Sequence, residues 1–253
     1  HKGYGIPMAT DIAFAIGILS LLGNRVPPAL KVFLTALAVI DDLGAIIMIA
    51  LFYTDDINLL NLGISLGIFG VLLILNRLKV NNLLWYLIGG IFMWYFMLHS
   101  GVHATITGVL LAFAIPFENG KPNSISYQLQ HWLHHPVAFL IIPIFALCNT
   151  AIVIEGDFVK TISQPYSLGI VFGLVLGKPL GILLFSWLTV KLKITQLPEG
   201  FTWKRLTGLG MLGGIGFTMS IFITLLAFAD VEIINNSKFV IVIASSLSGI
   251  LGY

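Results

Sequence analysis

The sequence predicts an all-α, polytopic membrane protein, and three observations support this fold class. Apolar residues make up 58% of the 253-residue chain and charged residues only 9%, whereas soluble domains average about 25% charged residues. The mean hydropathy is +1.00. Long apolar runs recur, and helices that satisfy their own backbone hydrogen bonds can carry such runs through lipid. We therefore expect a single transmembrane domain over residues 1–253.

The apolar runs place the expected helices in order. A segment at 6–22 is broken near Ala9-Thr10-Asp11, and a helix at 29–53 follows it. At about 1.5 Å per residue, the second run is long enough for a hydrocarbon core of about 30 Å. Further spans are expected within 61–154, at 168–190, at 206–228 and at 238–253. The expected core bundle comprises about 4–53 and 168–228, and the total is eight spans plus a half-helix.

The loop charges alternate from one side of the predicted bundle to the other. One side carries nine basic residues against two acidic ones, so it is expected to face the cytoplasm. That side holds Arg25, Lys31, Arg77, Lys79, Lys121, Lys191, Lys193, Lys204 and Arg205, with Glu118 and Glu199. The other side holds Asp55, Asp56, Glu155, Asp157, Asp230 and Glu232, with Lys160 and Lys238.

Two adjacent carboxylates, Asp41 and Asp42, lie in the middle of the 28–53 run. A charge at the bilayer centre costs roughly 2.5–3.5 kcal/mol on insertion scales, and such residues are functional by default. Neighbouring helical residues point about 100° apart, so the two carboxylates cannot share one role. Lys178 is the cation available within a span to neutralise one of them. We expect an Asp41–Lys178 contact, with Asp42 exchangeable; a purely structural ion pair would leave Asp42 unexplained.

Two interrupted helices form the second feature. One breaks at Thr10-Asp11, and the other breaks across 213–218, which contains Gly214, Gly216 and Thr218. Unwound backbone at membrane depth lines protein or a cavity, and paired interruptions point to a transporter site. Asp11 could offset the positive N-terminal ends of half-helices that meet there. A cluster of packing glycines is the alternative interpretation of the second break.

The histidines have two interpretations each. His103 precedes a short helix and could sense pH, because the unperturbed pKa of histidine is about 6.5; a structural, hydrogen-bonded histidine is the alternative. His131, His134 and His135 have the i, i+3, i+4 spacing of one helix face. They could bind a proton or a metal, although an interfacial polar face explains the same pattern. The single cysteine, Cys148, excludes an intramolecular disulfide.

Together these residues resemble the NhaA-type Na+/H+ antiporters of bacteria, a family that itself contributed to the rule linking broken helices to binding sites. The matching stretches cover essentially the whole chain: residues 6–15, 37–47, 52–54, 100–105, Gly177-Lys178-Pro179-Leu180-Gly181, Leu197-Pro198-Glu199-Gly200 and 214–220. The resemblance implies a fold of twelve transmembrane helices in which the fourth and eleventh are unwound and cross. Eight to nine of these helices would be present, and helices before the fourth would be missing from the start of the chain.

The resemblance also implies residue roles. Asp41 and Asp42 would bind Na+, Li+ or H+ in turn, with Thr10 as a further ion ligand and Lys178 as partner of Asp41. Asp11, Gly214, Gly216 and Thr218 would belong to the helix crossing. His103, His131 and His134 are the pH-response candidates, whereas Gln130 departs from a glutamate that is common in the family.

The implied function is electrogenic, pH-regulated export of Na+ or Li+ in exchange for H+, in a multi-pass protein of the bacterial inner membrane. Such a protein would serve pH homeostasis and salt tolerance, would not be an enzyme, and would need no cofactor and no nucleic acid. Its partners would be membrane lipid and a second copy of itself. A sodium-coupled solute symporter of related fold and an intramembrane aspartyl protease are the alternatives. The protease would need two aspartates on different helices facing one water.

Overall fold

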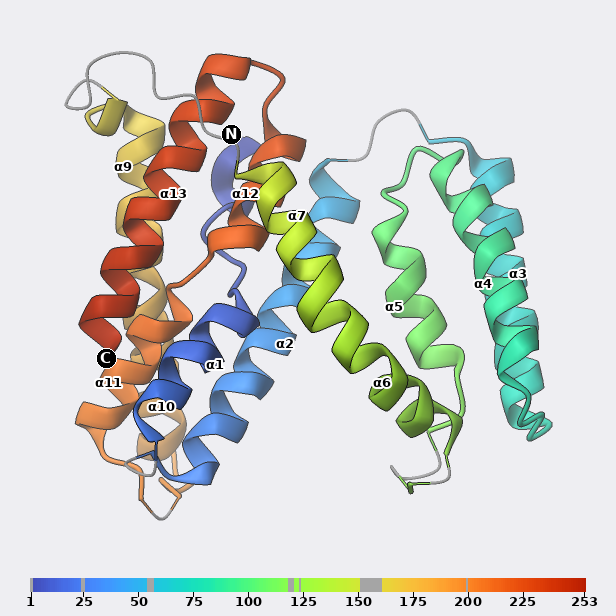
Figure 1. Cartoon of the computed structure of the whole chain (residues 1–253), viewed down its shortest axis with the longest axis horizontal. Coiled ribbons are helices and arrows are strands. Elements are labelled where there is room, and N and C mark those ends of the chain that lie inside the picture. The colour runs from blue at the N-terminus through green and yellow to red at the C-terminus, as the bar shows by residue number, and fades with distance from the viewer. Residues whose placement is uncertain are drawn as a thin grey trace. The chain divides into compact units, whose positions relative to one another are not determined.

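The computed structural model describes residues 2–23, 26–53, 57–117, 121–122, 124–150, 161–198 and 200–253. Regular structure in this part of the chain is helical (Figure 1), which confirms the predicted fold class. The elements are η1 (Lys2–Gly5), α1 (Ile12–Leu21), α2 (Pro28–Phe52), α3 (Leu59–Arg77), α4 (Leu83–Leu98), α5 (Thr105–Ala114), α6 (Ile125–Pro136), η4 (Val137–Ile141), α7 (Ile142–Asn149), α9 (Pro165–Phe172), η5 (Gly173–Gly177), α10 (Lys178–Lys191), α11 (Trp203–Gly213), α12 (Phe217–Ala227) and α13 (Val231–Gly252).

Polar side chains mark where several helices begin. Asn58, Asn82, Ser124 and Asp230 each accept a hydrogen bond from a backbone N–H in the first turn of α3, α4, α6 and α13, respectively. Such residues are favoured at this position because the first N–H groups of a helix have no partner within it. Most helix starts therefore follow from local sequence.

Five helical stretches are long and apolar enough to cross a bilayer: Pro28–Phe52, Leu59–Arg77, Ile125–Asn149, Pro165–Lys191 and Val231–Gly252. The pair α11 and α12, bent by 44° at its break, would make a sixth, and α1, α4 and α5 are shorter apolar helices. These statements cover the described residues alone, and the expected total of eight spans stays a prediction. The spans themselves make this a multi-pass membrane protein.

The chain divides into two compact units, which are described separately. The larger comprises His1–Ala45 and Phe145–Tyr253, and the smaller comprises Ile46–Ile144. The expectation of one domain over residues 1–253 stays a prediction. Because Asp41, Asp42, Lys178 and both helix breaks fall in the larger unit, their geometry can be described together.

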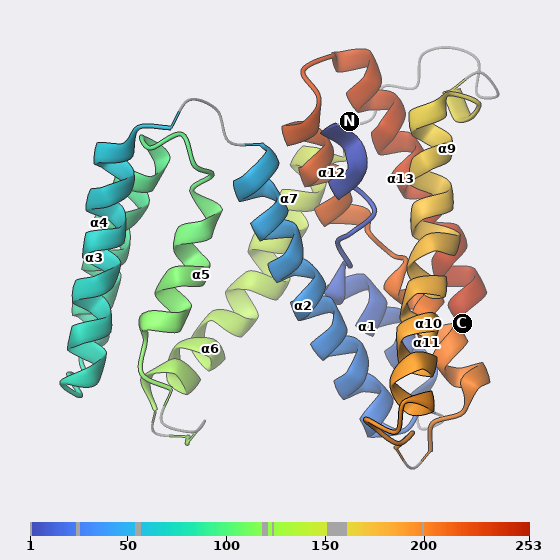
Figure 2. The same ribbon diagram turned by 180° about the vertical axis from the view of Figure 1, so that it is seen from behind.

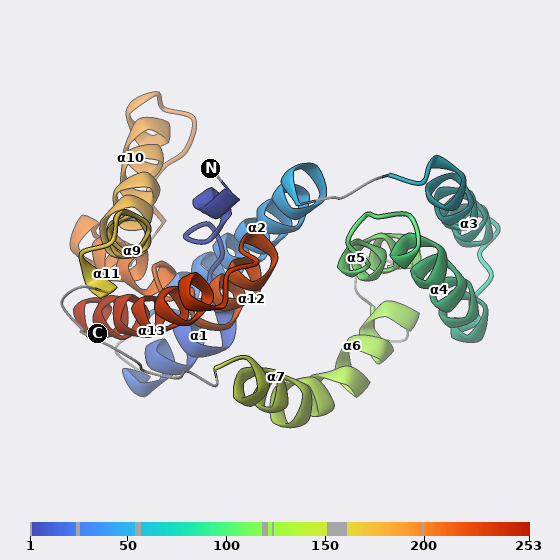
Figure 3. The same cartoon turned by 90° about the horizontal axis from the view of Figure 1, so that it is seen from above.

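In the smaller unit, α3 and α4 lie side by side (Figures 1 and 3). The Ser65 hydroxyl donates to the Met93 carbonyl across this contact at 3.0 Å, and both residues are buried. A Cβ on Gly89 would lie 2.7 Å from Leu72 Cδ2, so glycine permits the close approach. Small residues and interhelical hydrogen bonds are the usual means of holding helices together in lipid.

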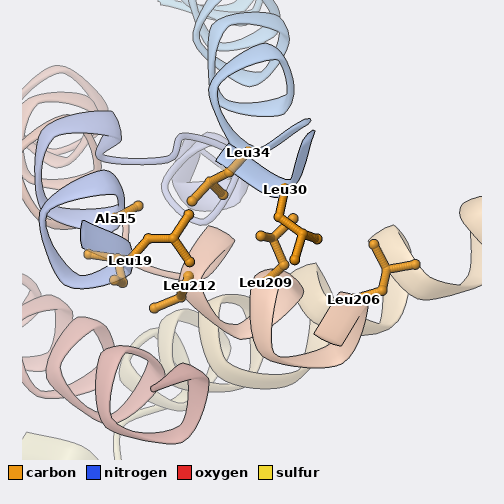
Figure 4. Packing of buried hydrophobic residues seen from close by; sticks show 8 residues of the cluster. Ala15, Leu19, Leu30, Leu34, Leu206, Leu209 and Leu212 are labelled. Carbon is orange, nitrogen blue, oxygen red and sulfur yellow. The ribbon is translucent and has the colours of Figure 1, made fainter. Parts of the chain in front are cut away.

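In the larger unit, α13 packs along α9, and both views of the ribbon show the two helices adjacent (Figures 1 and 2). A leucine-rich cluster holds α1, α2 and α11 together (Figure 4). Its buried members are Ala15, Leu19, Leu30, Leu34, Leu206, Leu209, Leu212 and Ile215. This cluster fixes the helices that carry the two breaks and the carboxylate pair.

One predicted loop charge is in a different place. Lys238 was expected at the outer end of the last span, but α13 already begins at Val231 and buries this side chain to 8% exposure. Asp230 caps α13 with its side chain, which allows the helix to start earlier than the apolar run does. Several other predicted loop charges lie outside the described residues: Arg25, Asp55, Asp56, Glu118, Glu155, Asp157, Lys160 and Glu199.

Replacing Leu34 by Ala should destabilise the larger unit, because Leu34 is fully buried in the leucine-rich cluster. Such substitutions cost about 2–5 kcal/mol in soluble cores. We expect a loss near the lower end of this range, since lipid is as apolar as the core. Leu21→Ala, at a side chain that is 76% exposed, is the control and should have little effect. The midpoint of thermal unfolding in detergent measures both, and equal midpoints would contradict the packing described.

Candidate ion-binding site

The Lys178 ammonium lies against the first carboxylate of the pair. Its Nζ is 3.0 Å from Asp41 Oδ2, and the two side chains are 9% and 22% exposed. Among the described residues, this is the one ion pair that the structure forms. The same Nζ donates to the Met8 carbonyl at 2.6 Å. The predicted Asp41–Lys178 contact is thus present in the geometry, together with a backbone acceptor that sequence reasoning missed.

A π-helical turn sets the position of Lys178. Residues Gly173–Gly177 form this turn directly before α10 begins at Lys178. A Cβ on Gly173 would lie 2.8 Å from Pro7 Cβ, so the turn packs closely against the first helix break. Single π-helical turns are frequent at functional sites, because they shift the register of the residues that follow.

Asp42 differs from Asp41 in its surroundings. Its Oδ1 atom is buried and has no hydrogen-bond partner among the described residues. A buried carboxylate oxygen without a donor is costly unless the group takes up a proton or a cation. The two neighbouring carboxylates therefore have different surroundings, since one is paired with an ammonium and the other keeps an unoccupied acceptor.

The Thr10 hydroxyl joins Asp41 to the second helix break. Its Oγ1 is 2.8 Å from Asp41 Oδ2 and 3.0 Å from the Gly213 carbonyl oxygen, and Thr10 is fully buried. A hydroxyl has one proton to donate and two lone pairs to accept with. Thr10 can therefore share its proton between these acceptors or donate to one of them.

The Asp11 carboxylate fastens the two breaks to each other. One oxygen accepts from the Phe14 N–H and caps α1, while the other accepts from the Thr218 N–H at 3.1 Å and the Thr218 hydroxyl at 2.6 Å. The Asp11 N–H donates to the Ile215 carbonyl at 2.6 Å. An anion at this point compensates the positive N-terminal ends of both α1 and α12. Because its acceptors are filled by donors from the two breaks, Asp11 acts as a structural link.

Glycines make the second break possible by allowing close contact. A Cβ on Gly214 would overlap the Leu174 carbonyl oxygen of the π-helical turn. A Cβ on Gly216 would overlap the Ser220 hydroxyl, which itself donates to the Ile6 carbonyl at 2.7 Å. These glycines thus serve close packing, and the same packing holds the turn before Lys178 against the second break. A packing role for the glycines is therefore compatible with a site at the breaks.

A cavity of about 700 Å³ leads to the ion pair. Asp41 and Lys178 line it, together with Met8, Gly44 and Ser186. A largely apolar cavity with a few convergent polar groups is the usual form of a small-ligand site. The Asp41–Lys178 pair thus borders a cavity within the larger unit.

The histidines belong to the smaller unit. His103 Nδ1 lies 2.9 Å from the Thr105 hydroxyl, and burial lowers the pKa of His103 below its usual value, which favours the neutral ring. On α6, His131 stacks on Tyr127, and His134 meets the edge of His135. The described residues contain no group of three or more His, Cys, Asp or Glu side chains that could hold a metal. A proton-binding or metal-binding role of the α6 histidines stays a prediction beside the polar-face interpretation.

Sequence reasoning missed two backbone acceptors, the carbonyls of Ile6 and Met8, which bind Ser220 and Lys178. The signal for them was the predicted break at Thr10-Asp11, because the carbonyls just before an unwound segment lose the N–H partners that a continuous helix would supply. Which side chains bind these carbonyls depends on residues more than 160 positions away.

Comparison with known proteins gives a match over the whole chain. A family model described as Na+/H+ antiporter 1 matches residues 1–253. The chain is 68% identical over 253 residues to a Na(+)/H(+) antiporter NhaA of Flavobacterium psychrophilum, covering all of this chain and 66% of that protein. It is 62% identical over 252 residues to the Na(+)/H(+) antiporter NhaA of Cytophaga hutchinsonii, covering 65% of that protein. It is 49% identical over 255 residues to that of Escherichia coli O1:K1, covering 66% of it. The chain therefore spans about two thirds of the length of these relatives.

Replacing Gly214 by Ala should destabilise the protein, because the new methyl group would overlap the Leu174 carbonyl, which belongs to the backbone and cannot rotate away. We expect a loss of about 1–3 kcal/mol, as for other overpacked sites. Gly17→Ala in α1, where no atom lies within 4 Å of the added Cβ, should instead be neutral or slightly stabilising. Thermal unfolding of the two variants tests this; a stable Gly214→Ala variant would show that the close contact is absent.

The Asp41–Lys178 pair can be tested by a double-mutant cycle. Lys178→Gln leaves the Asp41 carboxylate without its counter-charge and should cost about 3 kcal/mol of stability. Asp41→Asn combined with Lys178→Gln should recover part of this loss, because no unpaired charge remains. Chemical or thermal unfolding of the single and double variants measures the coupling. Purely additive effects would mean that the two groups do not interact.

Proposed function

Because the chain belongs to the Na+/H+ antiporter 1 family, a family of transporters rather than enzymes, we propose that it exchanges Na+ or Li+ for H+ at Asp41 and Asp42. The observation that supports this most directly is the contrast between the two carboxylates. Asp41 is neutralised by Lys178, whereas Asp42 keeps a buried oxygen without a donor. That oxygen is suited to a proton or a hard cation, since Na+-like ions prefer oxygen ligands.

Competition between the ions explains the exchange. In the cation-free state, Asp42 carries a proton and Asp41 is paired with Lys178. A Na+ ion that enters needs both carboxylates, so it displaces the proton of Asp42 and the ammonium of Lys178. Lys178 then gives up one proton, and its neutral amine still donates to the Met8 carbonyl, its second acceptor. The Thr10 hydroxyl can then donate to Gly213 and turn a lone pair toward the cation.

The charge balance supports electrogenic exchange. Asp42 and the Asp41–Lys178 pair provide two places at which a proton can be gained when Na+ leaves. Release of one Na+ for more than one H+ moves net charge, so the membrane potential and the proton gradient would both drive Na+ export. Alternating exposure of the site would follow from rocking of one bundle against another, as in other transporters with broken helices.

The remaining expectations belong to the same proposal. The protein would lie in the bacterial plasma membrane, would contribute to pH homeostasis and salt tolerance, and would use no resident cofactor. Regulation by pH would involve His103, and lipid and a second copy of the chain would be its partners. These roles are proposals for a chain that spans about two thirds of the length of its relatives.

The two alternatives are separated by the site. An aspartyl protease needs two carboxylates that face one catalytic water. Here Asp11 is occupied by donors from Phe14 and Thr218, and Asp41 is occupied by Lys178. A sodium-coupled symporter would require an organic solute for Na+ movement, which a solute-free flux assay excludes.

The substitution Asp42→Asn should abolish Na+-dependent proton movement, because an amide neither titrates nor carries the charge that binds Na+. We expect at least a hundredfold lower rate in sealed vesicles, followed with a pH-sensitive dye on addition of NaCl or LiCl without other solutes. Asp230→Asn, which changes an exposed capping carboxylate on α13, is the matched control and should keep its flux. Flux that survives Asp42→Asn would overturn the assignment of the site.

A further inference from the structure

A second cavity in the larger unit lies apart from the ion site. Its volume is about 640 Å³, and none of its lining residues lines the cavity at Asp41. Four helices form it: α1 and α13 contribute their C-terminal ends, α2 contributes its first turn, and α11 lines it from Lys204 to Leu212. These ends adjoin the basic loops that the sequence predicts to face the cytoplasm.

The interior of this cavity is apolar. Leucines from four helices line it, and Figure 4 shows four of these side chains, Leu19, Leu30, Leu209 and Leu212, turned toward a common region. Gly208 and Gly252 contribute the contact between α11 and α13, because a Cβ on Gly252 would lie 2.8 Å from Leu212 Cγ. From Lys204 to Leu212 the helix rises about 12 Å, so the lining extends from the membrane surface into the hydrocarbon region.

The mouth of the cavity is cationic. Lys204 and Arg205 line it from the first turn of α11, and both side chains are exposed. Arg205 Nη1 donates to the Gly200 carbonyl at 2.7 Å, which orients the guanidinium. Because the described residues form one ion pair, at Asp41 and Lys178, neither cation at the mouth is neutralised by a described carboxylate. The neighbouring Trp203 is 39% exposed, as is typical of the membrane–water interface.

We propose that this cavity binds one anionic phospholipid, with its phosphate at Lys204 and Arg205 and the start of an acyl chain against Leu22 and Leu251. A negatively charged head above an apolar tail matches the arrangement of two cations above an apolar interior. A net negative headgroup is favoured over a zwitterionic one, because cationic side chains near the surface attract anionic lipids. The bound lipid would contact α1, α2, α11 and α13 at once and so stabilise the larger unit.

The proposal is independent of ion exchange and is tested on the purified 253-residue chain in detergent. Dioleoyl phosphatidylglycerol should raise the midpoint of thermal unfolding by several degrees, whereas dioleoyl phosphatidylcholine should not. Native mass spectrometry should retain one phosphatidylglycerol per chain. Lys204→Gln with Arg205→Gln should weaken its apparent affinity by at least tenfold. Lys191→Gln with Lys193→Gln removes two cations from the same end that do not line the cavity, and it should leave the affinity unchanged.

A second variant tests the apolar part of the site. Thr207→Phe would place a ring in the cavity without changing any charge, and it should also prevent retention of phosphatidylglycerol. An equal rise in the midpoint of thermal unfolding with phosphatidylcholine, or with inorganic phosphate alone, would overturn the proposal. So would retention of phosphatidylglycerol that neither variant reduces, or no retained lipid at all.

Discussion

The site depends on one ammonium group held between a carboxylate and a backbone carbonyl. Lys178 contacts Asp41 Oδ2 at 3.0 Å and the Met8 carbonyl at 2.6 Å. A carboxylate at membrane depth is costly without a counter-charge, and a carbonyl freed by a broken helix is costly without a donor. One side chain meets both needs. The π-helical turn before Lys178 and the glycine contacts around it hold the ammonium in this position.

The helix breaks are themselves held together by a small set of buried hydrogen bonds. Asp11 accepts donors from both α1 and α12, and Thr10 lies within reach of both Asp41 and Gly213. In lipid, an unwound segment must find such partners within the protein. The residues that tie the breaks together therefore also bring the second break to the carboxylate pair, so packing of the fold and assembly of the site share the same bonds.

The leucine-rich cluster connects this site with the cavity at the basic end of the larger unit. Leu30 and Leu34 lie on the helix that carries Asp41, and Leu212 lies one residue before the carbonyl that accepts from Thr10. Leu30 and Leu212 also line the proposed lipid cavity. A lipid bound there would act on the packing of the elements that present the site, through side chains that have fixed positions in a close-packed interior.

The sequence by itself determined the class of the protein, the approximate spans and the residues that lipid makes costly: Asp11, Asp41, Asp42 and Lys178. It could do so because hydrophobic runs and charge costs are local properties of a chain in lipid. Only the tertiary structure decided that Met8 and Ile6 offer carbonyls to Lys178 and Ser220, that Asp11 joins the two breaks, and that Lys238 is buried. Each of these contacts depends on which helices pack together. Hydrogen bonds between residues so far apart in the chain leave no periodic pattern in the sequence.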